Sequence, residues 1–429
     1  MGYQFSDRMD GHSLLHTPEG VRDIYNGECA KKLRVQENMH RVLKLYGFKD
    51  IETPTFEFFD IFNKERGTVA SKDMYKFFDR EGNTLVLRPD ITPSAARCVA
   101  KYYREEELPI RLCYMGNTFI NSSSYQGRLK EVTQLGAELV NDDTSDADAE
   151  MIALTIECLL QAGLSEFQVE VGHADFFLGL LEEADFDEEE AAQLKYLIES
   201  KNMFGMEDLI SRKGVSEEWK ELILKLPELF GNMDNIIYAK TKTRNERALN
   251  AADRLEKLYH ILEGYGLSDY VTFDLGMLSK YNYYTGIIFK AYTYGNGEAI
   301  VRGGRYDQLV GQFGKQAPAI GMAVVVDQLM AALSRQKVPE KETESMTLIL
   351  YKSDYRKTAI DLAGHFRNQG MQIEMVRKSS KRDLEEYRKY ALREEIGGIL
   401  YIEEKDSIQI INMKNGTIKN VNLNDLIEA

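Results

Sequence analysis

The segment "EVTQLGAELV", residues 131–140, combines a strand-forming pattern with side chains that could bind a polar ligand. Residues two apart share one face of an extended strand, so Gln134, Gly136 and Glu138 point to one side and Leu135 faces the other with its apolar neighbours. An amide and a carboxylate that flank a glycine predict an open floor that a ligand can approach. A solvated strand face gives the same pattern, and the spacing alone does not choose between the two.

Two other segments carry side chains of the same chemical kind. Asp90 in "LRPDITPS" lies at a strand-to-helix turn, where its carboxylate could bind a ligand or cap the following helix. The local pattern favours capping. Tyr283 and Tyr284 are adjacent in "KYNYYTGIIF", so their rings face opposite sides of the chain, and packing is the commoner role of such a pair.

The loop before the first segment contains no cation. It reads "INSSSYQG", residues 120–127, whereas a loop of this kind at the mouth of a pocket usually holds phosphate with arginines. The glycine-rich segment "RGGRYDQLVGQFG" lacks the phosphate-binding spacing GxGxxG and predicts close backbone packing beside a pocket. We find no Ser-His-Asp or Cys-His pattern.

The bulk composition restricts the class of protein. The 429 residues are enough for two or three domains, and the net charge of −15 argues against general nucleic-acid binding. The four cysteines lack a CxxC pair and the six histidines lack a spacing such as HExxH, so we expect free thiols, no metal site and a reducing cytoplasmic location. No signal peptide or membrane-spanning run is expected.

The pattern of periodicity predicts an α+β chain with two domains. Residues 1–335 mix strands and helices and contain a helical, acidic insertion at about 182–264 that has no strand pattern. The segment "KVPEKETES", residues 337–345, is typical of a linker. Residues 345–429 alternate strands and helices, which predicts a small α/β domain.

Local motifs predict where elements begin and end. A first helix over 28–47 is closed by Gly47, and a later helix begins with an N-cap at Thr144 or Ser145. The Asn-Gly pairs at 296–297 and 415–416 predict hairpins.

These segments together resemble a known family. "TPEGVRDIY", "YGFKDIETPTFE", "LVLRPDITPSAAR", "RLCYMGNTF", "QLGAELV", "YYTGIIF" and "GGRYDQLVGQFG" occur in the order seen in histidyl-tRNA synthetases, over most of residues 15–335. The region 345–429 looks like that family's anticodon-binding domain. The resemblance implies the class II synthetase fold, an antiparallel sheet flanked by helices, which dimerises through the region around Pro54.

Three segments depart from the synthetase pattern because each lacks an arginine. The arginine positions are occupied by Ile120 after "GNTF", by Ser279 before the paired tyrosines and by Gln328 on the closing helix. Two further positions of that family's loop, a glutamate and an arginine, are Ser122 and Ser123. A charge-assisted hydrogen bond is worth about 1.5–3 kcal/mol and ATP carries about four negative charges, so these losses predict that adenylate chemistry is abolished.

Two arginines nevertheless remain near these segments. Arg128 is a candidate for a residual anion contact, and Arg88 is expected to be structural.

The positions that bind histidine in the synthetase family are largely retained. They correspond to Asp90 (a glutamate in that family), Thr92, Gln134, Glu138, Tyr283 and Tyr284. The resemblance implies that the two carboxylates hold the ammonium and the polar ring of histidine, while a tyrosine and Gln134 orient the imidazole.

A synthetase-like chain that keeps these positions and lacks the activating arginines resembles the regulatory subunits of ATP phosphoribosyltransferase, the first enzyme of histidine biosynthesis. The resemblance implies a non-catalytic cytoplasmic chain without a cofactor. Such a chain binds a short-form catalytic subunit, activates it and makes it sensitive to L-histidine. It also implies a homodimer within a hetero-oligomer, with no membrane and no nucleic acid as a partner.

Two other interpretations stay open. The first is an active histidyl-tRNA synthetase, which the missing arginines disfavour. The second is a non-catalytic paralogue that senses histidine or tRNA, which requires a basic face on residues 345–429. The segment "RKSSKRDLEEYRKYALREE" mixes charges of both signs, so a solvated helix face explains it better.

Overall fold

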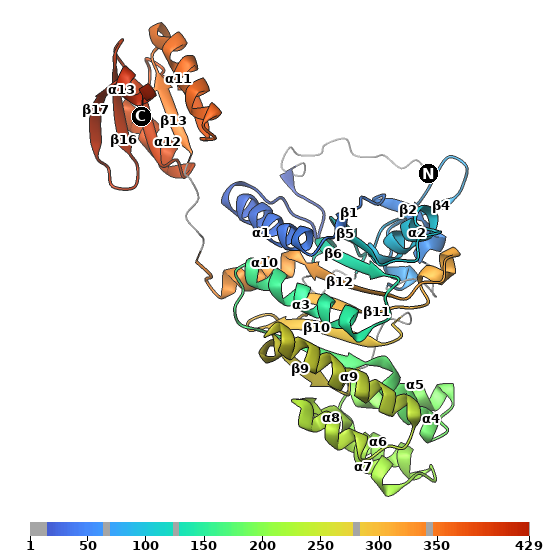
Figure 1. Cartoon of the computed structure of the whole chain (residues 1–429). Helices are drawn as coiled ribbons and strands as arrows, with labels where there is room; N and C mark the ends of the chain where they lie inside the picture. Colours follow the sequence, from blue (N-terminus) through green and yellow to red (C-terminus); the bar gives the residue numbers. More distant parts are fainter. Residues whose placement is uncertain (1–14, 63–68, 123–127, 278–283, 340–345, 429) are drawn as a thin grey trace, which may run out of the picture. The chain divides into compact units, whose positions relative to one another are not determined.

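The computed structural model describes residues 15–62, 69–122, 128–277, 284–339 and 346–428 (Figure 1). The chain divides into two compact units, a first unit over Met1–Val338 and a second unit over Pro339–Ala429. The candidate site lies in the first unit.

A nine-stranded sheet forms the centre of the first unit, with the strand order β1-β5-β6-β12-β11-β10-β7-β9-β8. The pairs β1/β5 and β7/β9 are parallel and the pairs between β5 and β7 are antiparallel, so the sheet is mixed where an antiparallel one was predicted. Parallel neighbours need a long crossover, and the helical insertion between β7 and β9 supplies it. The strands span Lys49–Asp50 (β1), Ile110–Phe119 (β5), Glu131–Val140 (β6), Phe167–His173 (β7), Phe230–Gly231 (β8), Val271–Asp274 (β9), Ile287–Thr293 (β10), Val301–Arg305 (β11) and Ala319–Val325 (β12).

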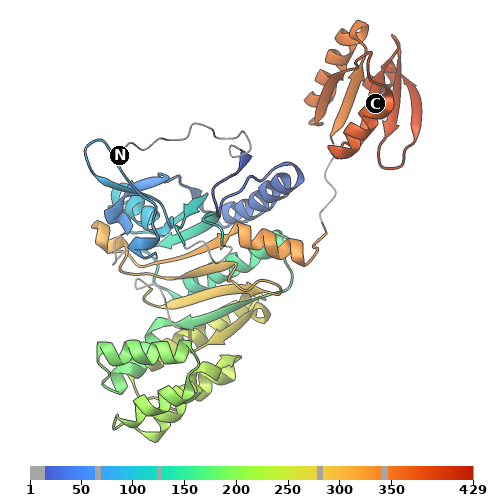
Figure 2. The same cartoon turned by 180° about the vertical axis from the view of Figure 1, so that it is seen from behind.

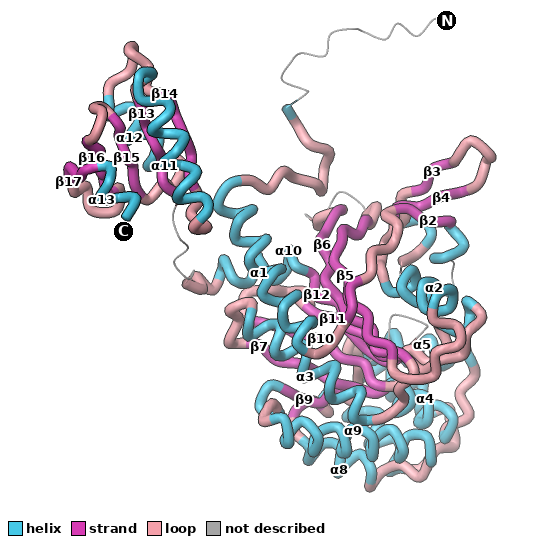
Figure 3. Tube along the Cα trace, turned by 45° about the horizontal axis from the view of Figure 1, so that its top comes forward, coloured by secondary structure: helices cyan, strands magenta, loops and turns pink. Residues whose placement is uncertain are grey.

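Four helices pack on one face of this sheet (Figures 1 and 3). They are α1 (Asn26–Leu45), α3 (Ser145–Gln161), α9 (Glu246–Tyr265) and α10 (Val326–Arg335). The main apolar core lies between these helices and the sheet. Thr144 is the N-cap of α3, with its side chain accepting a hydrogen bond from the Ala147 N–H at 3.2 Å, as predicted. Gly47 follows α1 with φ +79°, which suits the predicted end of that helix.

A three-stranded sheet with the order β2-β4-β3 lies beside the central sheet. Its strands are Phe56–Phe58 (β2), Lys76–Phe78 (β3) and Thr84–Leu87 (β4), and β4 leads through Pro89 into helix α2, Thr92–Tyr102. This strand–turn–helix unit was predicted, and it places Asp90 and Thr92 next to the central sheet.

Five helices beyond β7 form the insertion and gather at the β9 end of the sheet (Figures 1 and 2). They span Ala174–Glu183 (α4), Glu188–Glu199 (α5), Met203–Ser211 (α6), Glu217–Lys225 (α7) and Met233–Lys240 (α8). The prediction of no strand here was wrong, because Phe230–Gly231 (β8) pairs with β9. A two-residue strand is defined only by its distant partner, so no local periodicity reveals it.

Strands β10 and β11 form a hairpin, but its connection is not a tight Asn-Gly turn. The last paired residues are Ala291 and Val301, and the positive φ of +79° belongs to Gly295. In the hairpin of β16 and β17 the predicted Gly416 does have a positive φ, +71°.

The second unit is an α/β domain with the strand order β14-β13-β15-β16-β17. Strand β13 is parallel to β14 and β15, and apolar clusters lie on both faces. Its elements span Thr347–Tyr351 (β13), Arg356–Asn368 (α11), Ile373–Arg377 (β14), Leu384–Arg393 (α12), Gly398–Ile402 (β15), Ser407–Asn412 (β16), Ile418–Asn422 (β17) and Leu423–Glu428 (α13). Across the described parts of both units, no helix has the length and apolar character needed to cross a membrane.

Candidate functional site

Strand β6 presents polar side chains to a pocket and apolar side chains to the core. Gln134 and Glu138 line the pocket, whereas Leu135 and Ala137 are buried in the main core. The alternation predicted from the sequence is therefore confirmed, and the solvated-face interpretation is wrong for Glu138, which is only 1% exposed.

Glu138 lies in a ring of hydroxyl groups. Thr92 Oγ1 and Tyr114 Oη both donate to Glu138 Oε1 at 2.9 Å, and the hydroxyl of Tyr306 donates to Oε2. Burial raises the pKa of Glu138 to about 7, and the three hydroxyl groups offset part of that rise by favouring the carboxylate. The group is therefore close to half ionised at neutral pH.

The floor beside Glu138 differs from the open one that Gly136 predicted. A Cβ atom at Gly136 would lie 2.5 Å from Tyr114 Oη, so the ring of Tyr114 occupies the space that the glycine leaves. The glycine admits a tyrosine that binds Glu138, and the prediction of a ligand-accessible floor at this residue was wrong. The sequence did not indicate it, because the pairing of Tyr114 with Gly136 depends on the register of β5 and β6.

The floor of the pocket continues from Glu138 onto strands β12 and β11. Gly321 pairs with both Glu138 and Gly304, and both glycines line the pocket. A Cβ at Gly321 would lie 1.7 Å from Glu138 Oε2, and one at Gly304 would lie 2.7 Å from the ring of Tyr284. The glycine-rich segment thus provides close packing beside a pocket, as predicted.

Asp90 both caps helix α2 and faces the pocket. Its Oδ1 accepts hydrogen bonds from the Ile91 N–H at 2.7 Å and from Gln134 Nε2 at 3.2 Å, with a longer one from the Thr92 N–H at 3.4 Å. Its carboxylate therefore bonds the first N–H groups of α2 and also lines the pocket. The N-cap residue itself is Ile91, one position later than the capping interpretation placed it.

The pocket brings together most of the residues that the resemblance indicated. Its volume is about 120 Å³, and it opens to solvent at its mouth. The predicted residues that line it are Asp90, Thr92, Gln134, Glu138 and Tyr284, together with Ile120. Tyr283 and Ser279 lie outside the described residues.

The closing helix α10 has no cation facing the pocket at the position of the family's ATP arginine. Gln328 lies near Glu298, with Nε2 and Oε2 3.4 Å apart, and Arg128 forms an ion pair with the same glutamate at 2.9 Å. Arg128 is not among the described residues that line the pocket, so its predicted anion contact has no support there. Asp327 accepts hydrogen bonds from the Thr133 N–H at 2.6 Å and from Lys32 Nζ at 2.8 Å, which ties α10 to β6 and α1.

One guanidinium lines the pocket at a position that the sequence interpretation overlooked. Arg302 of β11 lies on the same strand face as Gly304 and is the only lysine or arginine among the described lining residues. From the sequence, only Arg88 and Arg128 were considered as remaining arginines, and Arg302 was not named. Strand alternation could have identified this residue, because Arg302 and Gly304 are two apart on one strand and therefore share a face.

Arg88 has the structural role that was predicted. It is 7% exposed, and it donates to the carbonyl oxygens of Asn117 at 2.8 Å and Thr53 at 2.7 Å. These bonds join β4 to β5 and to the segment before β2.

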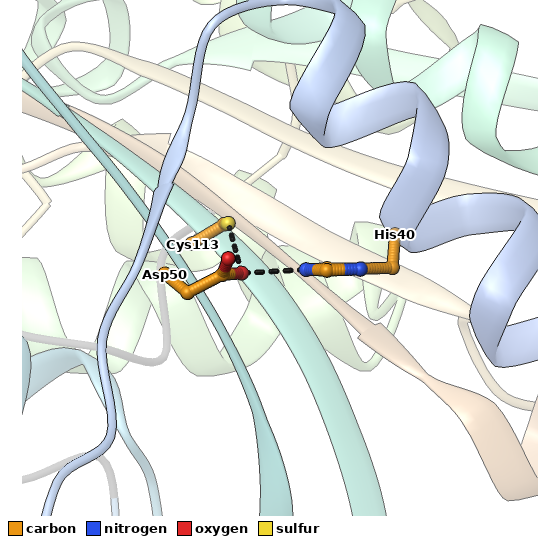
Figure 4. Close-up of side chains that lie close together, drawn as sticks. All are labelled: His40, Asp50 and Cys113. Carbon is orange, nitrogen blue, oxygen red and sulfur yellow. Dashed lines mark hydrogen bonds and ion pairs between the residues drawn. The ribbon is translucent and has the colours of Figure 1, made fainter.

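A second group of polar side chains lies away from the pocket, where α1 meets β1 and β5 (Figure 4). Asp50 accepts hydrogen bonds from His40 Nε2 at 2.5 Å and from the thiol of Cys113 at 3.3 Å, and it binds Lys44 at 2.7 Å. Hydrogen bonds from His40 and Lys44 hold the pKa of Asp50 below its usual range, and burial raises the pKa of Cys113 to about 12. Ion pairing and a protonated thiol account for the cluster, although its donor types are also metal ligands.

Comparison with known proteins agrees with this geometry. The family of histidyl-tRNA synthetases matches residues 20–329. A histidyl-tRNA synthetase from Nostoc sp. has a TM-score of 0.80 and 19% identity over 96% of this chain and 98% of its own, which supports the fold alone. Together with the sheet and helices described above, these matches confirm the predicted class II synthetase fold.

Several relatives resemble the chain over nearly its whole length. An ATP phosphoribosyltransferase regulatory subunit from Acetivibrio thermocellus is 40% identical over 97% of this chain and 99% of its own. One from Clostridium novyi is 35% identical over 96% and 98%. A crystal structure from Bacillus halodurans, described as an ATP phosphoribosyltransferase regulatory subunit/histidyl-tRNA synthetase, has a TM-score of 0.81 and 33% identity over 90% of this chain and 98% of its own. The chain belongs to the family of ATP phosphoribosyltransferase regulatory subunits, a histidyl-tRNA synthetase-like family.

Proposed function

We propose that this chain binds a short-form catalytic subunit of ATP phosphoribosyltransferase, activates it and confers feedback by L-histidine, without catalysis of its own. The observation that carries the proposal is the lining of the pocket. Asp90 and Glu138 are retained, while Ile120 stands in the lining and Gln328 lies beside Glu298 where the synthetases have arginines. The names of the relatives support the same assignment.

The charges in this lining suit an amino acid better than a nucleotide. ATP carries about four negative charges, and charge-assisted hydrogen bonds must replace the water that it loses on binding. Among the described lining residues, the carboxylates of Asp90 and Glu138 are accompanied by one guanidinium, that of Arg302. This balance matches one ammonium and one carboxylate, and it leaves most of the charge of a triphosphate without a partner.

The direct test is assembly with a short catalytic subunit. We expect the purified chain to co-elute with that subunit in size-exclusion chromatography and to raise its turnover of ATP and phosphoribosyl pyrophosphate. L-histidine should then inhibit the complex and leave the isolated catalytic subunit unaffected. A catalytic subunit that is equally active and equally sensitive to histidine on its own would contradict the proposal.

The place of histidine can be tested on the chain alone. We expect Glu138→Ala to weaken histidine binding in calorimetry by roughly tenfold or more, because a charged hydrogen bond is lost. Glu131→Ala is a matched control, since Glu131 is on the same strand but is not among the described lining residues. Equal binding by the Glu138 variant and the parent would place histidine elsewhere.

One observation favours a second function, that of an active histidyl-tRNA synthetase. The pocket does contain a guanidinium, Arg302, and the first unit has the synthetase fold. ATP–pyrophosphate exchange that depends on histidine would establish this activity. We expect none above background.

We also propose that the chain forms a homodimer through the three-stranded sheet. Phe56, Phe58 and Phe77 lie on one face of β2 and β3 and are 53%, 56% and 37% exposed, while Glu57 on the opposite face is buried and pairs with Arg97 at 2.7 Å. Aromatic side chains that point outward while a charge points inward favour a partner surface over this sheet.

A further inference from the structure

The register of the sheet defines the position of Arg302 relative to the rest of the pocket. In one row across the sheet, Gly136 of β6 pairs with Ala323 of β12, which pairs with Arg302 of β11. In the next row on the same face, Glu138 pairs with Gly321, which pairs with Gly304. Arg302 is therefore two strands away from β6, across a floor made of small residues.

Small residues form the floor between the two sides, and the carboxylate of Glu138 and the ring of Tyr284 lie over two of them, Gly321 and Gly304. Ala323, Gly321 and Gly304 all line the pocket, and a side chain larger than alanine is absent between Glu138 and Gly304 or between Gly136 and Arg302 in these described rows. Neighbouring strands lie about 4.8 Å apart, so positions two strands apart are separated by roughly 10 Å along the floor.

The two sides of the pocket carry opposite charge. On one side Asp90 is bound to Gln134, and Glu138 lies close enough to Asp90 for the two carboxylates to repel each other. On the other side stands the guanidinium of Arg302. A zwitterion is the ligand whose charges match this arrangement.

We propose that Arg302 binds the α-carboxylate of the amino acid in this pocket, while Asp90, Gln134 and Glu138 face its ammonium and side chain. The proposal rests on the proposed function and extends it. It assigns to β11 the carboxylate contact that the segment around Ser279 provides in the synthetases. A planar guanidinium matches a carboxylate with two parallel hydrogen bonds, which gives selectivity for an intact amino acid over its reduced or decarboxylated forms.

The test compares two ligands that differ at this one group. L-histidine has the carboxylate, and L-histidinol has a neutral hydroxymethyl group in its place. We expect the full-length parent chain to prefer L-histidine in isothermal titration calorimetry. In Arg302→Gln the affinity for L-histidine should fall roughly ten- to hundredfold, the range for a lost charged contact, while the affinity for L-histidinol should change less than about twofold.

The control variants separate a carboxylate contact from a general loss of positive charge. Lys290→Gln removes the next cation in the same row, since Lys290 pairs with Arg302 on β10 but is not among the described lining residues. It should leave the preference for histidine intact. Arg302→Lys keeps the positive charge without the planar guanidinium and should retain part of the preference for histidine. This variant also allows the test if Arg302→Gln is unstable.

Two outcomes would overturn the inference, and they are distinguishable. If the parent binds L-histidine and Arg302→Gln keeps the full preference over L-histidinol, Arg302 does not hold the carboxylate, although the proposed histidine site stands. If the parent binds neither ligand, the histidine site fails and this inference fails with it.

Discussion

At the scale of single residues, Glu138 is the group whose chemistry depends most on its surroundings. It is buried, yet three hydroxyl groups donate to it, from α2, from β5 and from the residue that follows β11. These donors favour the carboxylate and burial favours the acid, so the pKa of about 7 reflects an opposition between the two effects. A ligand with a cationic group would also favour the carboxylate, so its binding would deprotonate Glu138.

The raised pKa of Glu138 makes stability depend on pH. In the unfolded chain the pKa is near 4.5, and in the folded chain it is about 7, so between these values the folded state binds more protons. Glu138 therefore adds about 3 kcal/mol to the free energy of unfolding below pH 4.5, and this stabilisation is lost as the pH rises to 7. Glu138→Gln should therefore lose less stability than the parent between pH 5 and pH 8.

Urea unfolding followed by the fluorescence of Trp219 measures this effect. Trp219 is the single tryptophan of the chain and is buried in the first unit, so its signal reports that unit. Parallel pH profiles for the parent and the variant would mean that Glu138 titrates normally.

Much of the lining of the pocket could be predicted, and the two exceptions have different causes. Gln134, Glu138 and the dual candidate Asp90 followed from alternation and from a turn motif, which are local properties of the chain. Tyr114 was missed because its role depends on register between two strands. Arg302 could have been found by the rule that located Glu138, but the segment was interpreted only through its glycines.

At the scale of elements, strand β11 is fixed by a buried ion cluster behind the pocket. Asp148 of α3 binds Arg305 of β11 at 2.6 Å and Arg254 of α9 at 2.6 Å, and its side chain is fully buried. Arg305 follows Gly304 directly, so this cluster also fixes the position of the pocket floor.

Removing the shared carboxylate should destabilise the first unit strongly. Asp148→Ala removes the buried carboxylate that Arg305 and Arg254 share, although Arg305 keeps its ion pair with Asp307 at 3.2 Å, and we expect a loss of about 3–5 kcal/mol in the free energy of unfolding. Asp208→Ala is the control, since Asp208 pairs with Arg212 on the exposed surface of α6, and it should cost under about 1 kcal/mol. Similar losses for both variants, measured by urea unfolding with Trp219 fluorescence, would rule out a structural role for the cluster.

Helices with a sustained apolar periodicity were predicted well. Strands that exist only through pairing with a distant segment were not. Helices α1 and α3 follow from apolar spacing and from capping residues. Strand β8 and the parallel pairs at the ends of the sheet depend on contacts between distant segments, which one sequence does not encode locally.

At the scale of the whole molecule, the exposed aromatic face of the three-stranded sheet determines how copies of the chain can associate. If two copies meet there, Phe58→Glu places a charge in the interface and should convert the dimer to a monomer. Phe204→Glu is the matched control, because Phe204 is 82% exposed on α6 in the insertion. Sedimentation velocity separates the species, and a parent that is monomeric at micromolar concentration would refute the assignment.

Glu298 limits what redesign of this chain can achieve. It already pairs with Arg128 and lies beside Gln328. An arginine restored at position 328 would therefore form an ion pair with Glu298 and would not be available to bind a nucleotide. If the chain lacks amino-acid activation, as proposed above, restoring that activity would require neutralising this glutamate as well as adding basic groups at positions 120 and 279. Single reversions should stay silent in exchange assays for that reason.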